Sequence, residues 1–132
     1  MRYLSVFLLA FGVLAQTPVG TMSELMLKIV YPTSDAIFYV GHKAQKTEKD
    51  WQDLQASALT LAETANLLMS PDRARDKALW MKDAALLRNV GEKAFKAANA
   101  RDLPALEALN AELYEACQSC HEHYRPGYRR RL

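Results

Sequence analysis

Residues 102–121 read DLPALEALNAELYEACQSCH, and this stretch decides the fold class of the chain. Asp102 is a favourable N-cap residue, and Pro104 is tolerated in the first turn of a helix. Apolar or thiol side chains then recur at steps of about three and four residues, namely at Leu106, Leu109, Leu113, Ala116, Cys117 and Cys120. This spacing predicts an amphipathic helix whose buried face contains both cysteines.

The same helix ends in Cys117-Gln118-Ser119-Cys120-His121, and C-x-x-C-H is the attachment sequence of a covalent c-type haem. The two thiols can add to the haem vinyl groups, and the imidazole can bind the iron as proximal ligand. On a helix, positions 117, 120 and 121 project toward one side. The sequence therefore predicts one haem c per chain, anchored by Cys117 and Cys120 and ligated by His121.

A C-x-x-C pair has three other uses in proteins. A thioredoxin-like redox site needs a βαβ context, and a zinc site needs further Cys or His ligands at matching spacing. Neither context is visible in the sequence. A structural disulfide is a third alternative, because the chain has two cysteines, but a bridge that closes so short a loop would constrain the unfolded chain little.

The N-terminal residues predict export from the cytoplasm. Met1-Arg2 is a short positive region, Tyr3 to Leu14 is mostly apolar, and Ala15 is a small residue suited to cleavage. Residues 1–15 are therefore expected to be a signal peptide, and the mature protein is expected in the periplasm. We expect no stable membrane anchor, because the apolar run is shorter than the ~20 residues of a spanning helix. The alternative is a cytosolic protein with an apolar N-terminal helix.

Length and charge limit the remaining possibilities. Residues 16–132 suffice for a single domain with one modest core. The chain has 17 Lys and Arg residues against 15 Asp and Glu residues, so its charge gives no basis for nucleic-acid binding. No recognisable nucleophile and base motif is present, and we expect the protein not to be an enzyme.

Three further helices are predicted before residue 102, and no segment shows the sustained alternation of a half-buried strand. The first covers about residues 21–40, with a kink or restart at Pro32. The second begins at Thr47, which forms a capping-box pattern with Asp50. The third is expected to begin at Ser70-Pro71-Asp72 and to run to about Ala100. The sequence thus predicts an all-α, antiparallel four-helix bundle, whose interior can hold a cofactor.

The last part of the fourth helix carries a family resemblance. Residues 117–125 read CQSCHEHYR, and the chain resembles the cytochrome c-prime family, the class II c-type cytochromes, in which C-x-x-C-H-x-x-[YF]-R ends a four-helix bundle. Class I cytochromes c carry their attachment motif near the N-terminus. The resemblance spans the mature chain in helix order, although only these nine residues are specific to the motif.

The resemblance assigns a role to each residue of the motif. It implies that Cys117 and Cys120 form the thioether bonds, that His121 is the proximal ligand, and that Arg125 lies near this imidazole and the haem propionates. Tyr124 would pack near the haem. Taken alone, Arg125 is equally well explained as a cation favoured at the C-terminus of a helix, and Tyr124 as an aromatic at the edge of the core.

The first helix is expected to supply the other axial position. In relatives with a distal methionine the iron is six-coordinate and low-spin, and in typical cytochromes c-prime an apolar residue leaves it open. Met22 and Met26 lie one turn apart on the predicted inward stripe. The resemblance favours Met26, with Met22 second, whereas methionines that merely fill the core are the alternative. His42 and His123 are weaker candidates.

These expectations lead to three functions. The first is one-electron transfer to a redox protein partner. Arg125 and residues 129–131 could steer the chain toward an acidic partner, and a basic tail that is only solvated is the alternative. The second is binding of nitric oxide or carbon monoxide by five-coordinate iron. The third is a scaffold that the haem only stabilises. The resemblance also implies a homodimer through the first two helices, although their exposed faces show no second apolar stripe.

Overall fold

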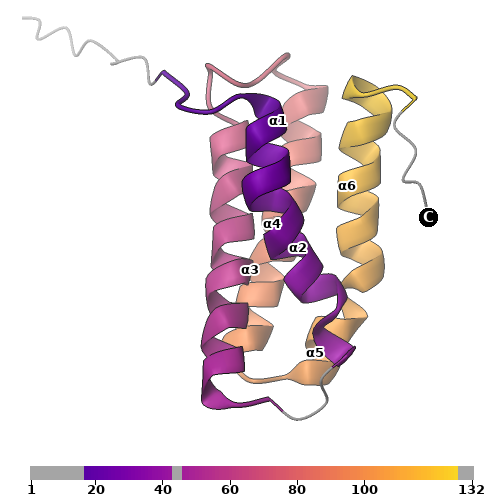
Figure 1. Ribbon diagram of the computed structural model, residues 1–132. Helices are drawn as coiled ribbons and strands as arrows, with labels where there is room; N and C mark the ends of the chain where they lie inside the picture. The colour runs from indigo at the N-terminus through magenta and orange to yellow at the C-terminus, as the bar shows by residue number, and fades with distance from the viewer. Residues whose placement is uncertain (1–16, 43–45, 128–132) are drawn as a thin grey trace, which may run out of the picture.

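The computed structural model describes residues 17–42 and 46–127, and every regular element in these ranges is helical. The elements are α1 (Met22–Leu25), the π-helical turn η1 (Met26–Val30), α2 (Tyr31–Phe38), the 3-10 turn η2 (Val40–His42), α3 (Glu48–Leu68), α4 (Leu79–Asn99), α5 (Leu103–Ala108) and α6 (Asn110–Tyr124). Figure 1 shows these helical segments alongside one another: the α1–α2 segment, α3, α4, and α5 with α6. The predicted all-α class and four-helix packing are confirmed.

The irregularity predicted at Pro32 takes the form of a π-helical turn within a continuous helical segment. The Tyr31 N–H donates to the carbonyl of Met26, five residues earlier, and Pro32 lies at the start of α2. The Thr33 hydroxyl donates to the carbonyls of Ile29 and Val30 at 2.7 and 3.1 Å. The proline therefore does not end the helical segment, because the wider turn directly before α2 accommodates it.

The pair α3 and α4 forms the closely packed side of the bundle. The predicted capping box starts α3: the Asp50 N–H donates to the Thr47 hydroxyl, and the Thr47 N–H donates to the Asp50 carboxylate. Gly91 of α4 lies against Ala62 of α3, where an added Cβ would be 2.8 Å from the Ala62 nitrogen. Glycine thus permits a backbone approach that a larger residue would oppose.

The start of the third long helix differs from the prediction. The helix does not begin at Ser70 but at Leu79, and the segment between α3 and α4 forms turns. One carboxylate oxygen of Asp76 accepts hydrogen bonds from the N–H groups of Ala78, Leu79 and Trp80 at 2.8–3.1 Å. Asp76 thus satisfies N–H groups that have no partner in the first turn, so the helix begins after it.

The last predicted helix is divided in two. The Asp102 carboxylate accepts from the Ala105 N–H at 3.0 Å, as expected of the cap, but α5 gives way to α6 at Leu109. The helix ends at Tyr124, before Pro126, as predicted. Among the described residues, no helix combines the length and apolar character needed to cross a bilayer. The predicted signal peptide, residues 1–15, lies outside the described ranges.

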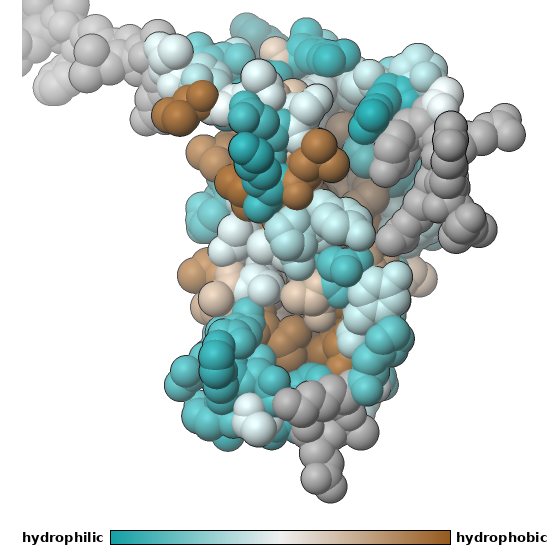
Figure 2. Space-filling model, viewed as in Figure 1, coloured by the Kyte–Doolittle hydropathy of each residue, from teal (hydrophilic) through white to brown (hydrophobic). Residues whose placement is uncertain are grey.

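Apolar side chains on the face of the bundle drawn in Figure 2 do not form one continuous surface. On the face drawn in Figure 2, they occur in separate groups among hydrophilic side chains. The homodimer therefore stays a prediction that the resemblance alone supports.

Candidate cofactor site

A cavity of about 1130 Å³ lies between the α1–α2 segment, α4 and α6. Ligand pockets commonly have volumes of ~300–1,000 Å³, so this one has room for a large cofactor. Its apolar lining comes from these three sides and from Leu68 at the end of α3: the other residues are Met22, Met26, Leu27, Val30, Phe38, Trp80, Ala84, Leu87 and Ala116. An apolar cavity of this size inside a four-helix bundle is a typical place for a prosthetic group.

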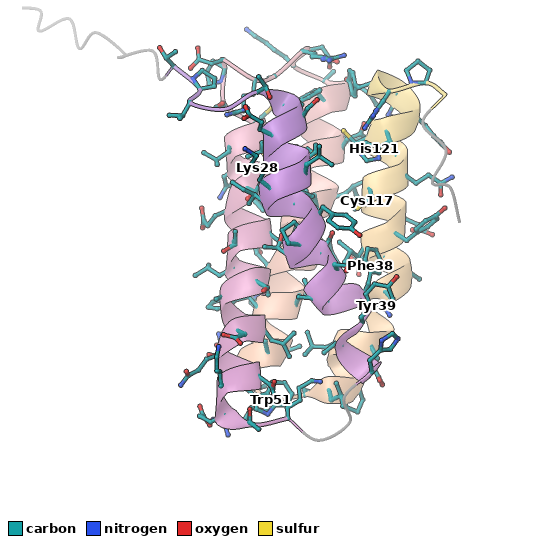
Figure 3. The ribbon with its side chains drawn as sticks, in the orientation of Figure 1. Lys28, Phe38, Tyr39, Trp51, Cys117 and His121 are labelled. Atoms are coloured by element: carbon teal, nitrogen blue, oxygen red, sulfur yellow. The ribbon has the colours of Figure 1, made fainter. Side chains whose placement is uncertain are left out.

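One wall of the cavity carries the motif of α6. Cys117, Cys120 and His121 all line it and are all partly buried. Figure 3 shows Cys117 and His121 on the side of α6 that is turned toward α2. Neither cysteine forms a disulfide in the described part of the chain. The structure thus brings the three residues together on one wall, as their spacing on a helix predicts.

Burial shapes the protonation of this wall. It lowers the pKa of His121 below its ordinary value, and the nearby positive charge of Arg125 lowers it further. The neutral imidazole, which is the form that ligates metals, is therefore favoured. Burial also raises the pKa of Cys120 to about 11, assisted by Asp83 and Cys117 and opposed by Arg75. Every regular element in the described ranges is helical, so these ranges lack the βαβ context that the thioredoxin-like alternative needs.

The facing wall carries both methionine candidates. Met22 and Met26 line the same cavity from α1 and η1, and each is partly buried. A capping box between Thr21 and Glu24 fixes the start of this segment. Both thioethers also pack against the core. The arrangement therefore brings a methionine to the wall facing His121 but does not choose between the two, and Met26 remains the prediction.

Tyr124 belongs to an aromatic cluster at the end of the cavity. Its hydroxyl donates to the carboxylate of Asp76, and this hydrogen bond holds the pKa of Asp76 below its ordinary value. The Tyr124 ring meets the Trp80 ring edge-on, with 4.8 Å between centroids. The Arg75 guanidinium lies 5.9 Å from the Trp80 ring centroid and 6.0 Å from that of Tyr124. Tyr124 thus links α6 to the loop before α4, a role that the sequence did not predict.

Arg125 is the C-cap of α6 and lines the cavity beside His121. Its charge acts on the pKa of that imidazole, as described above. The structure therefore places Arg125 near the predicted proximal ligand. The other histidines lie elsewhere: His123 pairs with Asp83, and His42 borders a separate, smaller hollow of about 230 Å³ near η2.

Sequence reasoning missed Asp83, which is only 1% exposed and lines the cavity. One carboxylate oxygen accepts from the Ser119 hydroxyl at 2.8 Å, and the other lies 2.7 Å from Nδ1 of His123. A signal was present in the sequence, because Asp83 interrupts an apolar stripe formed by Trp80, Ala84 and Leu87. A charged residue on such a stripe needs a partner, but the local sequence does not identify that partner.

Within residues 17–42 and 46–127, no three His, Cys, Asp or Glu side chains converge as ligands of a metal ion. The zinc alternative therefore lacks the additional ligands that it requires. Comparison with protein-family models, curated proteins and solved structures gives no match to this chain.

Proposed function

We propose that this chain is a periplasmic monohaem c-type cytochrome of the class II kind that works in one-electron transfer. One observation carries the proposal: the C-x-x-C-H residues and the two methionines, far apart in the sequence, line the same cavity. The chemistry of these donors matches a haem. Two thiols suit covalent attachment, and a neutral imidazole and a thioether are the pair that c-type cytochromes use to ligate iron.

Each residue of the site would have a separate task. Cys117 and Cys120 would hold the haem through thioether bonds, and His121 would hold the iron. Met26 would be a second protein ligand of the iron, from the facing wall. When bound, the haem would supply a one-electron Fe(III)/Fe(II) couple. The apolar walls exclude water around these donors, which is one of the properties by which a protein sets the potential of such a couple.

Residues at the rim would orient the cofactor and its contacts. Arg125 would place a positive charge beside His121 and near the haem carboxylates. Tyr124 would close the same end through its contacts with Asp76 and Trp80. The expected partner is a redox protein, and the basic residues Arg125 and 129–131 could steer the chain toward an acidic one.

A second function is favoured by one feature of the facing wall. Leu27 and Val30 line the cavity beside Met22 and Met26. If apolar side chains, and no sulfur, face the iron, its sixth position stays open. The protein would then bind nitric oxide or carbon monoxide, as a five-coordinate cytochrome c-prime does.

Mass spectrometry and absorption spectroscopy test both functions. The denatured chain should keep its haem, and Cys117→Ala with Cys120→Ala should abolish this covalent attachment. Haem that acidified organic solvent extracts from the wild type would refute the proposal. Spectra of the oxidised, reduced and carbon monoxide-treated reduced protein then separate the functions: low-spin bands that resist carbon monoxide support electron transfer, and high-spin bands that shift with it support gas binding.

A further inference from the structure

Asp83 stands apart from the other buried polar residues of the described chain. Besides Asp83, these are Ser34 and Thr64, which are 7% and 2% exposed. The Ser34 hydroxyl donates to the Tyr31 carbonyl, and the Thr64 hydroxyl donates to the Thr60 carbonyl, so both are satisfied within their own helical segment. Asp83 is satisfied by side chains of another helix. Its burial therefore depends on where α6 lies.

The two partners of Asp83 flank the last two residues of the motif. Ser119 and His123 are four residues apart on α6, so they share one face, and Cys120 and His121 lie between them in the sequence. Each partner contacts a different oxygen of the carboxylate. A rotation of α6 by one residue, about 100°, would remove both contacts and leave a buried carboxylate without partners. The carboxylate thus opposes any other rotational setting of α6.

Apolar packing holds the second half of α6 less fully than the first. The buried residues of the helix are Leu113 and Ala116, both in its first half, and none of residues 117–124 is buried. In the second half, Cys117 and Tyr124 are partly buried against the core, and Cys117, Cys120 and His121 border the cavity. Polar side-chain contacts therefore add to the hold on this half, and two of them go to Asp83.

We propose that Asp83 is a positioning residue, which sets the rotation of α6 so that Cys120 and His121 project into the cavity. Ser119, inside the C-x-x-C-H motif, and His123, just after it, act as its two contacts. As a statement about haem binding, this inference rests on the proposed function. As a statement about α6, it rests only on the contacts described above.

Hydrogen exchange of the full-length protein as purified tests the inference. In Asp83→Ala, amides of residues 117–124 should exchange roughly 10- to 100-fold faster relative to those of α3, as expected when α6 loses its two hydrogen bonds to a carboxylate. Thr64→Val is the matched control: it removes a buried hydroxyl away from α6, so it should leave this ratio unchanged. An Asp83→Ala ratio equal to that of Thr64→Val would refute the positioning role.

Variants of α6 keep the test decisive if Asp83→Ala does not fold. Ser119→Ala combined with His123→Ala should reproduce the local increase in exchange. Compared with this double variant, His123→Asn should restore most of the protection from exchange, because the side-chain amide N–H of asparagine takes a position close to Nδ1 of the imidazole. Unchanged exchange in the double variant, or no recovery with asparagine, would contradict the inference.

Spectroscopy connects the positioning role to the cofactor. In haem-loaded protein, Asp83→Ala should give absorption bands of more than one ligand state, whereas Thr64→Val should give the wild-type spectrum. A wild-type spectrum in Asp83→Ala would show that the carboxylate does not position His121. A wild type without covalent haem would instead refute the proposed function, and the exchange comparison would still decide the role of Asp83 in α6.

Discussion

Trp80→Phe should destabilise the protein through the loss of one buried hydrogen bond. Trp80 is 4% exposed, and its indole N–H donates to the carbonyl of Leu68 at 2.6 Å. Leu68 is the last residue of α3, where carbonyls lack partners within the helix. The indole thus satisfies the end of α3 from the start of α4. Phenylalanine keeps an aromatic ring in the cavity wall but cannot donate this hydrogen bond.

The expected cost combines two terms. A buried carbonyl left without its donor costs about 1–3 kcal/mol, and the smaller ring adds about 1 kcal/mol of lost packing. The free energy of unfolding should therefore fall by about 2–4 kcal/mol. Urea denaturation followed by circular dichroism measures this change, because the midpoint falls while the slope stays constant if the denatured state is unaffected.

Trp51→Phe is the matched control for this substitution. Trp51 lies in the first turn of α3 and is half-buried, and its indole donates no hydrogen bond to any residue that the structure describes. Its replacement should cost less than about 1.5 kcal/mol, as expected for loss of packing alone. Equal losses for Trp80→Phe and Trp51→Phe would refute the argument, because the hydrogen bond to Leu68 would then contribute nothing measurable.

Four other substitutions test the site and its support. His121→Ala should leave the thiols able to bind haem but give an abnormal spectrum, and a wild-type spectrum would mean that another residue holds the iron. Met26→Ala should convert the haem to a high-spin form that binds carbon monoxide, whereas Met22→Ala should lower only the stability of the protein. If Met22→Ala gave the high-spin form and Met26→Ala did not, Met22 would be the ligand. Gly91→Ala should lower the free energy of unfolding, measured by urea denaturation, by about 1 kcal/mol. Overpacking against Ala62 costs about 1–3 kcal/mol, which exceeds the gain of about 1 kcal/mol in helix propensity. A stabilised variant would contradict this close approach.

Features that depend on neighbouring residues could be predicted from the sequence. The caps at Thr47 and Asp102 and the irregularity at Pro32 lie where the local pattern indicates. Each results from hydrogen bonds, or a missing donor, within about five residues along the chain. The projection of Cys117 and His121 to one wall also follows from helical periodicity alone.

The start of α4 shows how tertiary contacts override a local signal. Ser70-Pro71-Asp72 is a favourable helix start by composition, yet Asp76 provides the cap, six residues later. The same carboxylate accepts from Tyr124, at the far end of the sequence. A contact over such a sequence distance leaves no trace in a local pattern, and so the competing start at Ser70 could not be excluded.

The sequence by itself determined the helical class, the apolar stripes and the identity of the candidate haem anchors, because these depend on periodicity and on one short motif. Only the tertiary structure decided that Met22 and Met26 share a cavity with that motif, and that Asp83 is satisfied by Ser119 and His123. The physical reason is that helix periodicity fixes which side chains share a face, whereas the packing of helices against each other fixes which faces meet.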